Sequence, residues 1–181
     1  METRHENPGS RRVLLGTTHG MIEGELAIGP ELRTLDYLNR GSTRFLSLKA
    51  ARMLSARPSL QGDGVHVNID TILWVAEVDA MRRAWRPTPK APLNRSGVRF
   101  CFTDCEILGF LHTPVQGDPF ARLNQERSPF LAVTSASIVG SDTEMAAAFL
   151  AVNSQQVFTV EMIADDDAAA AGVPAFEEAE A

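Results

Sequence analysis

Residues 20–26 read GMIEGEL, and residues 105–111, which begin 85 positions later, read CEILGFL. In the first stretch, apolar or glycine residues alternate with glutamates, which is the period of a half-buried β-strand. A glycine inside a strand usually marks a sharp bend or a close approach of two backbones. The glycine recurs as Gly24 and Gly109. The sequence therefore predicts two related strands that bend at equivalent positions.

The similarity extends well beyond these strands. A shift of 85 aligns residues 13–78 with 98–163 without a gap, and 13 of the 66 aligned pairs are identical. The alignment also keeps the apolar pattern, which indicates a tandem duplication. The repeated polar residues are asparagines, in the pairs Asn39/Asn124 and Asn68/Asn153. Asparagine tolerates left-handed backbone geometry and caps turns, so these pairs are interpreted as structural.

Each repeat contains the same series of elements. Two short apolar segments read as strands, and a helical segment follows them. A third strand comes next, and two further strands meet near an asparagine. The sequence therefore predicts a mainly β protein made of two tandem, bent, five-stranded antiparallel barrels, each with a short helix inserted between strands 2 and 3.

The expected domain organisation follows from the repeat and from local composition. Residues 13–79 and 97–163 form the two repeats. A basic, proline-rich linker at 80–96 joins them, because its prolines disfavour regular structure. The polar N-terminus at 1–12 and the acidic tail at 164–181 are expected to be disordered.

The strand order and the bent second strand resemble the Sm-like (Sm/Lsm/Hfq) family. GMIEGEL followed by FLSLKAARML fits the first family signature, and VNID before TILWV corresponds loosely to the second. The pattern is also similar to small bacterial domains of uncharacterised function. The resemblance implies Sm-like barrels in which strand 4 of one subunit pairs with strand 5 of the next. It therefore implies partners, or further copies of the chain, bound at strand edges.

The chain departs from the Sm-like pattern where that family contacts RNA. Arg44 and Pro129 precede the third strands, where the family has asparagine. Asn68 and Asn153 occupy the arginine position of the second signature. These differences argue against RNA binding at the usual pore.

Composition and charge place further limits on function. The net charge is −6, but seven of the 23 acidic residues lie from Glu161 onward, and the remaining 16 nearly balance the 17 basic residues. A neutral body lacks the positive field of most nucleic-acid binders. No apolar run is long enough to span a membrane, and the N-terminus does not resemble a signal peptide. A soluble, cytoplasmic protein is expected.

The residues that carry chemistry form no persuasive site. Cys101 and Cys105, with His112 nearby, are compatible with metal binding, but zinc sites usually show a second Cys/His pair. The first repeat has Gly16 and Gly20 at the cysteine positions, so small thiols replacing small residues is the alternative. Neither a nucleophile elbow nor a phosphate-binding loop is present. The sequence predicts no catalytic residues, metal or cofactor, and hence no enzyme.

Two segments are candidates for partner binding. In the linker, Arg82, Arg83 and Arg86 surround Trp85, a combination that suits an acidic protein surface, nucleic acid or an anionic membrane. In the tail, Phe176 lies in a small apolar cluster among acids. A solvated linker and a solvated tail are the alternatives.

Three functions remain open from the sequence. The favoured one is a non-enzymatic assembly or adaptor protein that binds protein partners or itself through strand edges; three chains would then close a ring of six barrels. The alternatives are an RNA-binding Sm-like regulator that uses the basic linker, and a small-ligand sensor with a groove between the barrels.

Overall fold

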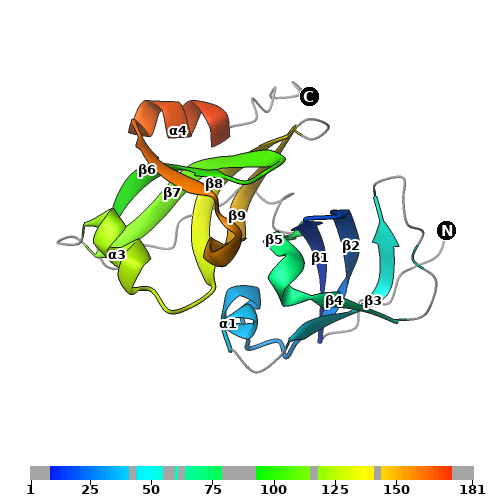
Figure 1. Ribbon diagram of the computed structural model, residues 1–181. Helices are drawn as coiled ribbons and strands as arrows, with labels where there is room; N and C mark the ends of the chain where they lie inside the picture. Colours follow the sequence, from blue (N-terminus) through cyan, green and yellow to red (C-terminus); the bar gives the residue numbers. More distant parts are fainter. Residues whose placement is uncertain are drawn as a thin grey trace, which may run out of the picture.

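The computed structural model describes residues 9–40, 44–54, 60, 64–78, 93–114, 118–140 and 144–172 (Figure 1). We call residues 9–78 the first half and residues 93–172 the second half. No helix in the described ranges is long and apolar enough to cross a membrane.

Both halves contain five strands in the same succession. The first half has β1 (Ser10–Thr17), β2 (Gly20–Ala27), α1 (Thr34–Leu38), β3 (Phe45–Met53), β4 (Gly64–Asn68), the 3₁₀ turn η1 (Ile69–Thr71) and β5 (Ile72–Glu77). The second half has β6 (Leu93–Cys101), β7 (Cys105–Pro114), α3 (Pro119–Gln125), β8 (Phe130–Gly140), β9 (Glu144–Asn153), η2 (Ser154–Gln156), β10 (Thr159–Ile163) and α4 (Asp165–Gly172). A short helix lies between the second and third strands of each half, α1 in the first and α3 in the second.

The ten strands form a single antiparallel sheet, in the order β10-β6-β7-β8-β9-β5-β1-β2-β3-β4. Within each half the order is therefore the same, and the register agrees too. Val13 faces Gly24 in the first half, and Val98 faces Gly109 in the second.

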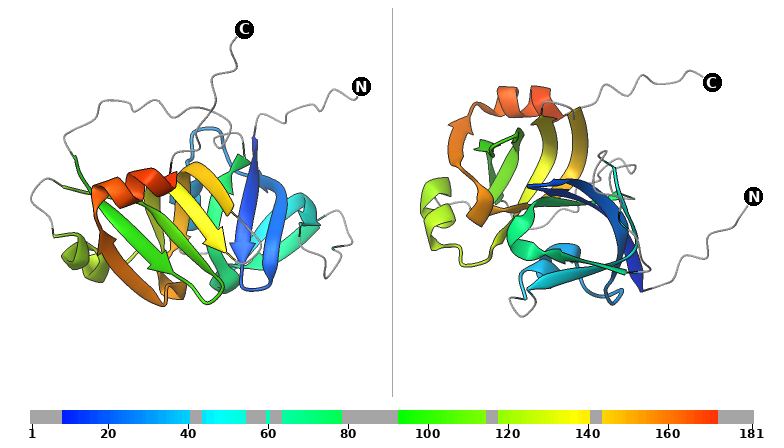
Figure 2. Two further views of the ribbon diagram at one scale, coloured as in Figure 1. Left: turned by 90° about the horizontal axis from the view of Figure 1, so that it is seen from above. Right: turned by 45° about the vertical axis from the view of Figure 1, so that its right-hand side comes forward.

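The prediction of a mainly β, antiparallel protein is confirmed. The prediction of two closed barrels is corrected: β5 pairs with β9 of the other half, and the sheet does not close on itself (Figures 1 and 2).

The sheet bends at the same place in both halves. The register between strands 2 and 3 shifts at Gly24 in the first half and at Gly109 in the second. A Cβ on Gly109 would lie 2.8 Å from the Val133 Cγ1 atom, so a side chain there has no room. On the facing strands, Ala50 and Ser135 have positive φ angles of 45° and 46°. These two residues are also 85 positions apart, so the duplication includes a strained backbone bulge.

Two hydrophobic clusters form the core, and each takes residues from both halves. The first-half cluster includes Phe130 and Ala151 from the second half. The second-half cluster includes Leu14, Trp74 and Ala76 from the first half. The halves therefore share their apolar interior instead of meeting at a polar surface.

The predicted boundaries need three corrections. Ser10–Arg12, expected to belong to a disordered N-terminus, lie in β1, and residues 93–96, expected in the linker, lie in β6. Residues 165–172 of the predicted disordered tail form α4, which lies along the second half (Figure 2). Ala168 of this helix is fully buried. Three aspartates in the first turn favour a helix, because they face its partly positive N-terminus.

Candidate functional site at the strand edges

We call the contact between the two halves, where β5 pairs with β9, the junction, and we compare the free edges of the sheet with it. Its backbone pairing is short, with Trp74 opposite Val152 and Val75 opposite Ala151. When the strands are counted within each half, β5 is strand 5 of the first half and β9 is strand 4 of the second, and these two strands pair here. Among the described residues, the sheet therefore ends in one strand of each type, β4 and β10, and the outer edge of each has no strand partner.

Asn153 links the two halves at the end of β9. Its Oδ1 accepts a hydrogen bond from the Gln155 backbone amide at 3.1 Å, which caps η2. Its Nδ2 donates across the junction to the Ile72 carbonyl at 2.8 Å. Asn153 is only 1% exposed, so both of its polar functions are satisfied inside the protein.

Asn39, just after α1, makes the second polar link. Its Nδ2 donates to the Phe130 carbonyl and its Oδ1 accepts from the Phe130 amide, both at 2.9 Å. The side chain thus pairs with the start of β8 as another strand would. The Phe130 ring is 1% exposed and packs in the first-half core.

At the free β4 edge, the equivalent residues lack these partners. Asn68 caps η1 as Asn153 caps η2, with the Asp70 amide 3.1 Å from its Oδ1. Its Nδ2 has no hydrogen-bond partner among the described residues. Phe45, the equivalent of Phe130, is 49% exposed. The β4 edge therefore presents the same asparagine and phenylalanine as the junction, but no described strand pairs with it.

A pocket of about 620 Å³ opens beside β4. Its walls are mostly apolar, with two histidines, His19 and His66, at its lining. The apolar wall residues Ile22, Met53, Val65 and Val67 are the repeat equivalents of Ile107, Ile138, Leu150 and Val152. In the second half, that set is buried in the cluster against which Trp74 and Leu73 pack.

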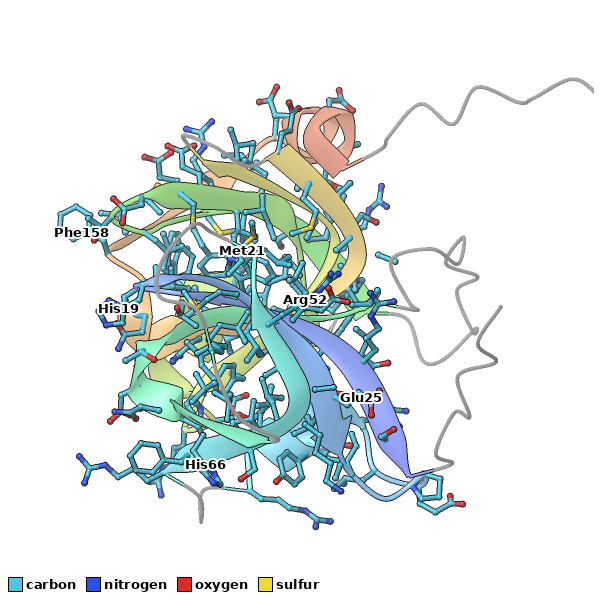
Figure 3. All side chains as sticks on the ribbon, turned by 90° about the vertical axis from the view of Figure 1, so that its right-hand side faces the viewer. His19, Met21, Glu25, Arg52, His66 and Phe158 are labelled. Atoms are coloured by element: carbon cyan, nitrogen blue, oxygen red, sulfur yellow. The ribbon has the colours of Figure 1, made fainter. Side chains whose placement is uncertain are left out.

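At the other end of the sheet, two aromatic side chains are exposed around β10. Phe158, directly before β10, is 83% exposed, and Phe120 of α3 is 44% exposed. Phe158 projects away from the sheet in Figure 3. Asn124, the equivalent of Asn39, lies exposed on the same helix α3 with no hydrogen-bond partner in the described part of the chain.

The outer face beside β10 is more polar than its counterpart at the junction. Arg99 forms ion pairs with Glu161 at 3.0 Å and with Glu106 at 3.7 Å. In the first half, the equivalents are Leu14, Ala76 and Met21, which contact the second-half core. This part of the β10 edge thus remains solvated where the junction is apolar.

The surroundings of Cys105 do not activate its thiol for chemistry. Burial, together with the nearby carboxylates of Asp104 and Glu106, raises the pKa of the Cys105 thiol to about 11. A thiol in this state is protonated near neutral pH and is a poor nucleophile. The described residues contain no group of three or more His, Cys, Asp or Glu that could hold a metal ion.

Glu23 forms a charged brace across three strands of the first half. Its carboxylate pairs with Arg12 and accepts a hydrogen bond from the Arg52 Nε at 2.8 Å. Burial acts to raise the pKa of Glu23, but the hydrogen bonds from Arg52 and Arg12 outweigh it and lower that pKa. The second half has Leu108 at the Glu23 position, so this brace belongs to the first half alone.

The predicted partner-binding residues Arg82, Arg83, Trp85, Arg86 and Phe176 lie outside the described residues. Arg95, a further positive charge of the predicted linker, lies in β6 with its guanidinium 4.5 Å from the Phe110 ring centroid.

The structure exposes apolar side chains that the sequence analysis did not single out. The exposed phenylalanines at positions 45, 120 and 158 were absent from the predicted sites. A usable signal for one of them was present, because Phe45 and Phe130 are an identical pair in the repeat.

Comparison with protein-family models, curated proteins and solved structures finds no match to this chain.

Proposed function

We propose that this chain is a non-enzymatic assembly protein that binds protein strands at its two free sheet edges. The observation that carries the proposal is the junction itself. There, a strand-5 edge and a strand-4 edge already pair, and Asn39 and Asn153 each form a hydrogen bond to the backbone of the other half. In the described part of the chain, one edge of each type stays open, at β4 and β10. An open strand edge exposes unpaired backbone groups and is a template for strand addition.

The resemblance to Sm-like proteins supports the same proposal. Each half has the strand order 5-1-2-3-4, with its bent second strand next to the third. In the Sm-like family, assembly uses strand 4 against strand 5. We infer that this chain is a fused pair of Sm-like units whose internal contact uses that mode.

The other functions have less support. RNA binding was attributed to the linker arginines, which lie outside the described residues. Ligand sensing was attributed to a groove between the halves, but all the described residues that line the 620 Å³ pocket belong to the first half.

Hydrogen exchange tests the proposal directly. The chain would be purified in its native complexes, and the exchange of its backbone amides would be compared with that of the isolated, dilute chain. We expect complex formation to slow exchange in β4 and β10 selectively. Slowed exchange confined to other elements, or native complexes that contain nucleic acid but no added strand, would contradict edge binding.

A further inference from the structure

We infer that the strand added at each edge comes from a second copy of this chain. Its register follows from the internal junction: each first-half residue is replaced by its equivalent 85 positions later, and each second-half residue by its equivalent 85 positions earlier. This inference rests on the proposed edge-binding function and names its partner. The β10 edge of one copy would pair with the β4 edge of the next. Thr159 would face Val67, and Val160 would face His66, as Trp74 faces Val152 and Val75 faces Ala151 within the chain.

The repeated asparagines carry the first step of the inference. Asn153 uses its Oδ1 to cap a 3₁₀ turn and its Nδ2 to reach across the junction to the Ile72 carbonyl. Asn68 makes the same cap, so its side chain is already oriented in the same way. In the shifted register, its Nδ2 would donate to the Val157 carbonyl of the next copy.

The second asparagine pair leads to the same register independently. Asn39 holds the backbone of Phe130 through two hydrogen bonds. Its equivalent Asn124 is exposed on α3 of the second half. The same shift places Asn124 opposite the backbone of Phe45 in the next copy. Two separate polar contacts are therefore recreated by a single displacement.

The apolar groups agree with this arrangement. Phe158 is the repeat equivalent of Leu73, which packs against the second-half core. The residues that would receive Phe158 are the equivalents of that core, and they line the pocket beside β4. Phe120 is the equivalent of Leu35, which packs against the first-half core. The described residues include five exposed large apolar side chains, and three of them, Phe45, Phe120 and Phe158, would become covered.

Such a contact joins unlike edges, so it repeats from head to tail. It leads to a closed ring or an open filament, and never to a two-fold symmetric dimer. The ion-paired face around Arg99 lacks the apolar contacts of the junction, so the contact between copies should be weaker than the contact between halves and should depend on concentration.

Cysteine cross-linking tests the register. The native thiols would first be removed by Cys101→Ser and Cys105→Ser, with thermal unfolding used to verify that the chain folds. One preparation then carries His66→Cys and another carries Val160→Cys. We expect oxidation of the mixture to give a covalent dimer that neither preparation forms alone. The control pairs Val160→Cys with Gly64→Cys, which lies two residues away on the same face of β4. Its yield should be at least about tenfold lower, because a disulfide requires Cβ atoms about 4 Å apart.

The pattern of products separates the possible failures. Faster cross-linking at position 64, or Val160→Cys linking to itself, would overturn the register while leaving edge binding intact. If the chain stays monomeric at high concentration, while another protein protects β4 and β10 in native complexes, the second-copy inference fails and the proposed function stands. If neither edge is ever protected, both fail.

A second measurement uses the exposed aromatic side chain. Phe158→Ser should weaken self-association, measured by light scattering across a dilution series, by at least about tenfold, because buried aromatic anchors dominate interfaces. Phe158→Leu, which restores the residue of the first half, should retain most of the association. Val139→Ser is the matched control, since Val139 is an exposed apolar residue on β8, away from both edges. Equal effects of Phe158→Ser and Val139→Ser would overturn the inference.

Discussion

The buried junction and the exposed edges of this sheet contain equivalent residues in opposite environments. Phe130 is 1% exposed at the junction, whereas its equivalent Phe45 is 49% exposed at the β4 edge. Asn153 has both polar functions bonded inside the protein, whereas the Asn68 side chain makes only its cap with the residues that the structure describes. A residue retained in both repeats can therefore stabilise the fold in one half and remain available for a partner in the other. Substitutions at equivalent positions should separate these two roles.

The largest effect is expected at the phenylalanine pair. Phe130→Ala removes a fully buried ring from the shared core and should lower the free energy of unfolding by about 3–5 kcal/mol. Phe45→Ala removes a half-exposed ring and should cost less than about 1 kcal/mol, while weakening self-association. Chemical denaturation measures the stability of both variants. Similar losses for the two would show that the β4 edge is already as well packed as the junction.

The asparagine pair should show a smaller contrast of the same kind. Asn39→Ala leaves the amide and carbonyl of Phe130 without their partner, which should cost about 1–3 kcal/mol. Asn124→Ala removes an exposed side chain and should change stability by no more than about 0.5 kcal/mol. Thermal unfolding of dilute protein makes the comparison. A stability loss in Asn124→Ala as large as in Asn39→Ala would contradict the distinction.

The charged brace of the first half predicts a pH dependence that the second half lacks. Because the pKa of Glu23 is lowered in the folded state, its contribution is present above the ordinary value of 4.5 and is lost as the pH falls through the folded-state value. Glu23→Gln should therefore cost about 1 kcal/mol near pH 7 and progressively less at acidic pH.

Unfolding free energies at several pH values between 7 and 3 test this expectation. Glu25→Gln, on the same strand, is the control. Its effect on the unfolding free energy should not shrink comparably between pH 7 and pH 3. A penalty for Glu23→Gln that stays constant down to pH 3 would mean that the brace does not depend on the charge of Glu23.

The smallest effect concerns the turn between strands 1 and 2, which has Gly20 in the first half and Cys105 in the second. With the pKa of Cys105 raised to about 11, its alkylation should be slow at neutral pH and its rate should still be rising above pH 9. A Cys101→Ser variant isolates this thiol for mass spectrometry. A rate that levels off below pH 9 would place the thiol in a more polar environment than the structure has.

Much of the strand pattern within each half could be predicted from sequence, because it depends on local periodicity. Alternation identified the second strand of the first half and the repeat identified its equivalent, while the apolar runs beginning at Phe45 and Phe130 identified the third strands. The single sheet could not be predicted in this way. Its central pairing involves only two residue pairs, from strands that also pair within their own halves. No period in the sequence distinguishes such a contact from a free edge.

The site was recognised only in part for a related reason. Interpreting the asparagines as caps accounts for Oδ1 of Asn68 and Asn153, which bond to the backbone two residues ahead. The role of Nδ2 depends on a carbonyl more than 80 residues away in sequence, which appears only in the folded chain. The helix α4 was missed because its acidic composition was taken as a sign of disorder. The structure shows why it forms a helix: α4 packs against the second half, with Ala168 buried beside Gly97 and the Asp165 carboxylate accepting a hydrogen bond from the Gly97 amide.

The shared core has a consequence for how this chain is made. The first-half cluster is completed by Phe130 and Ala151, which are synthesised 52 and 73 residues after Val78 ends the described part of that half. At typical translation rates of about 5–20 residues per second, the emerging first half waits several seconds with an unfilled apolar surface. Binding of a chaperone to stalled nascent chains that end before residue 130, but not to chains that extend past β9, would be the signature of this delay.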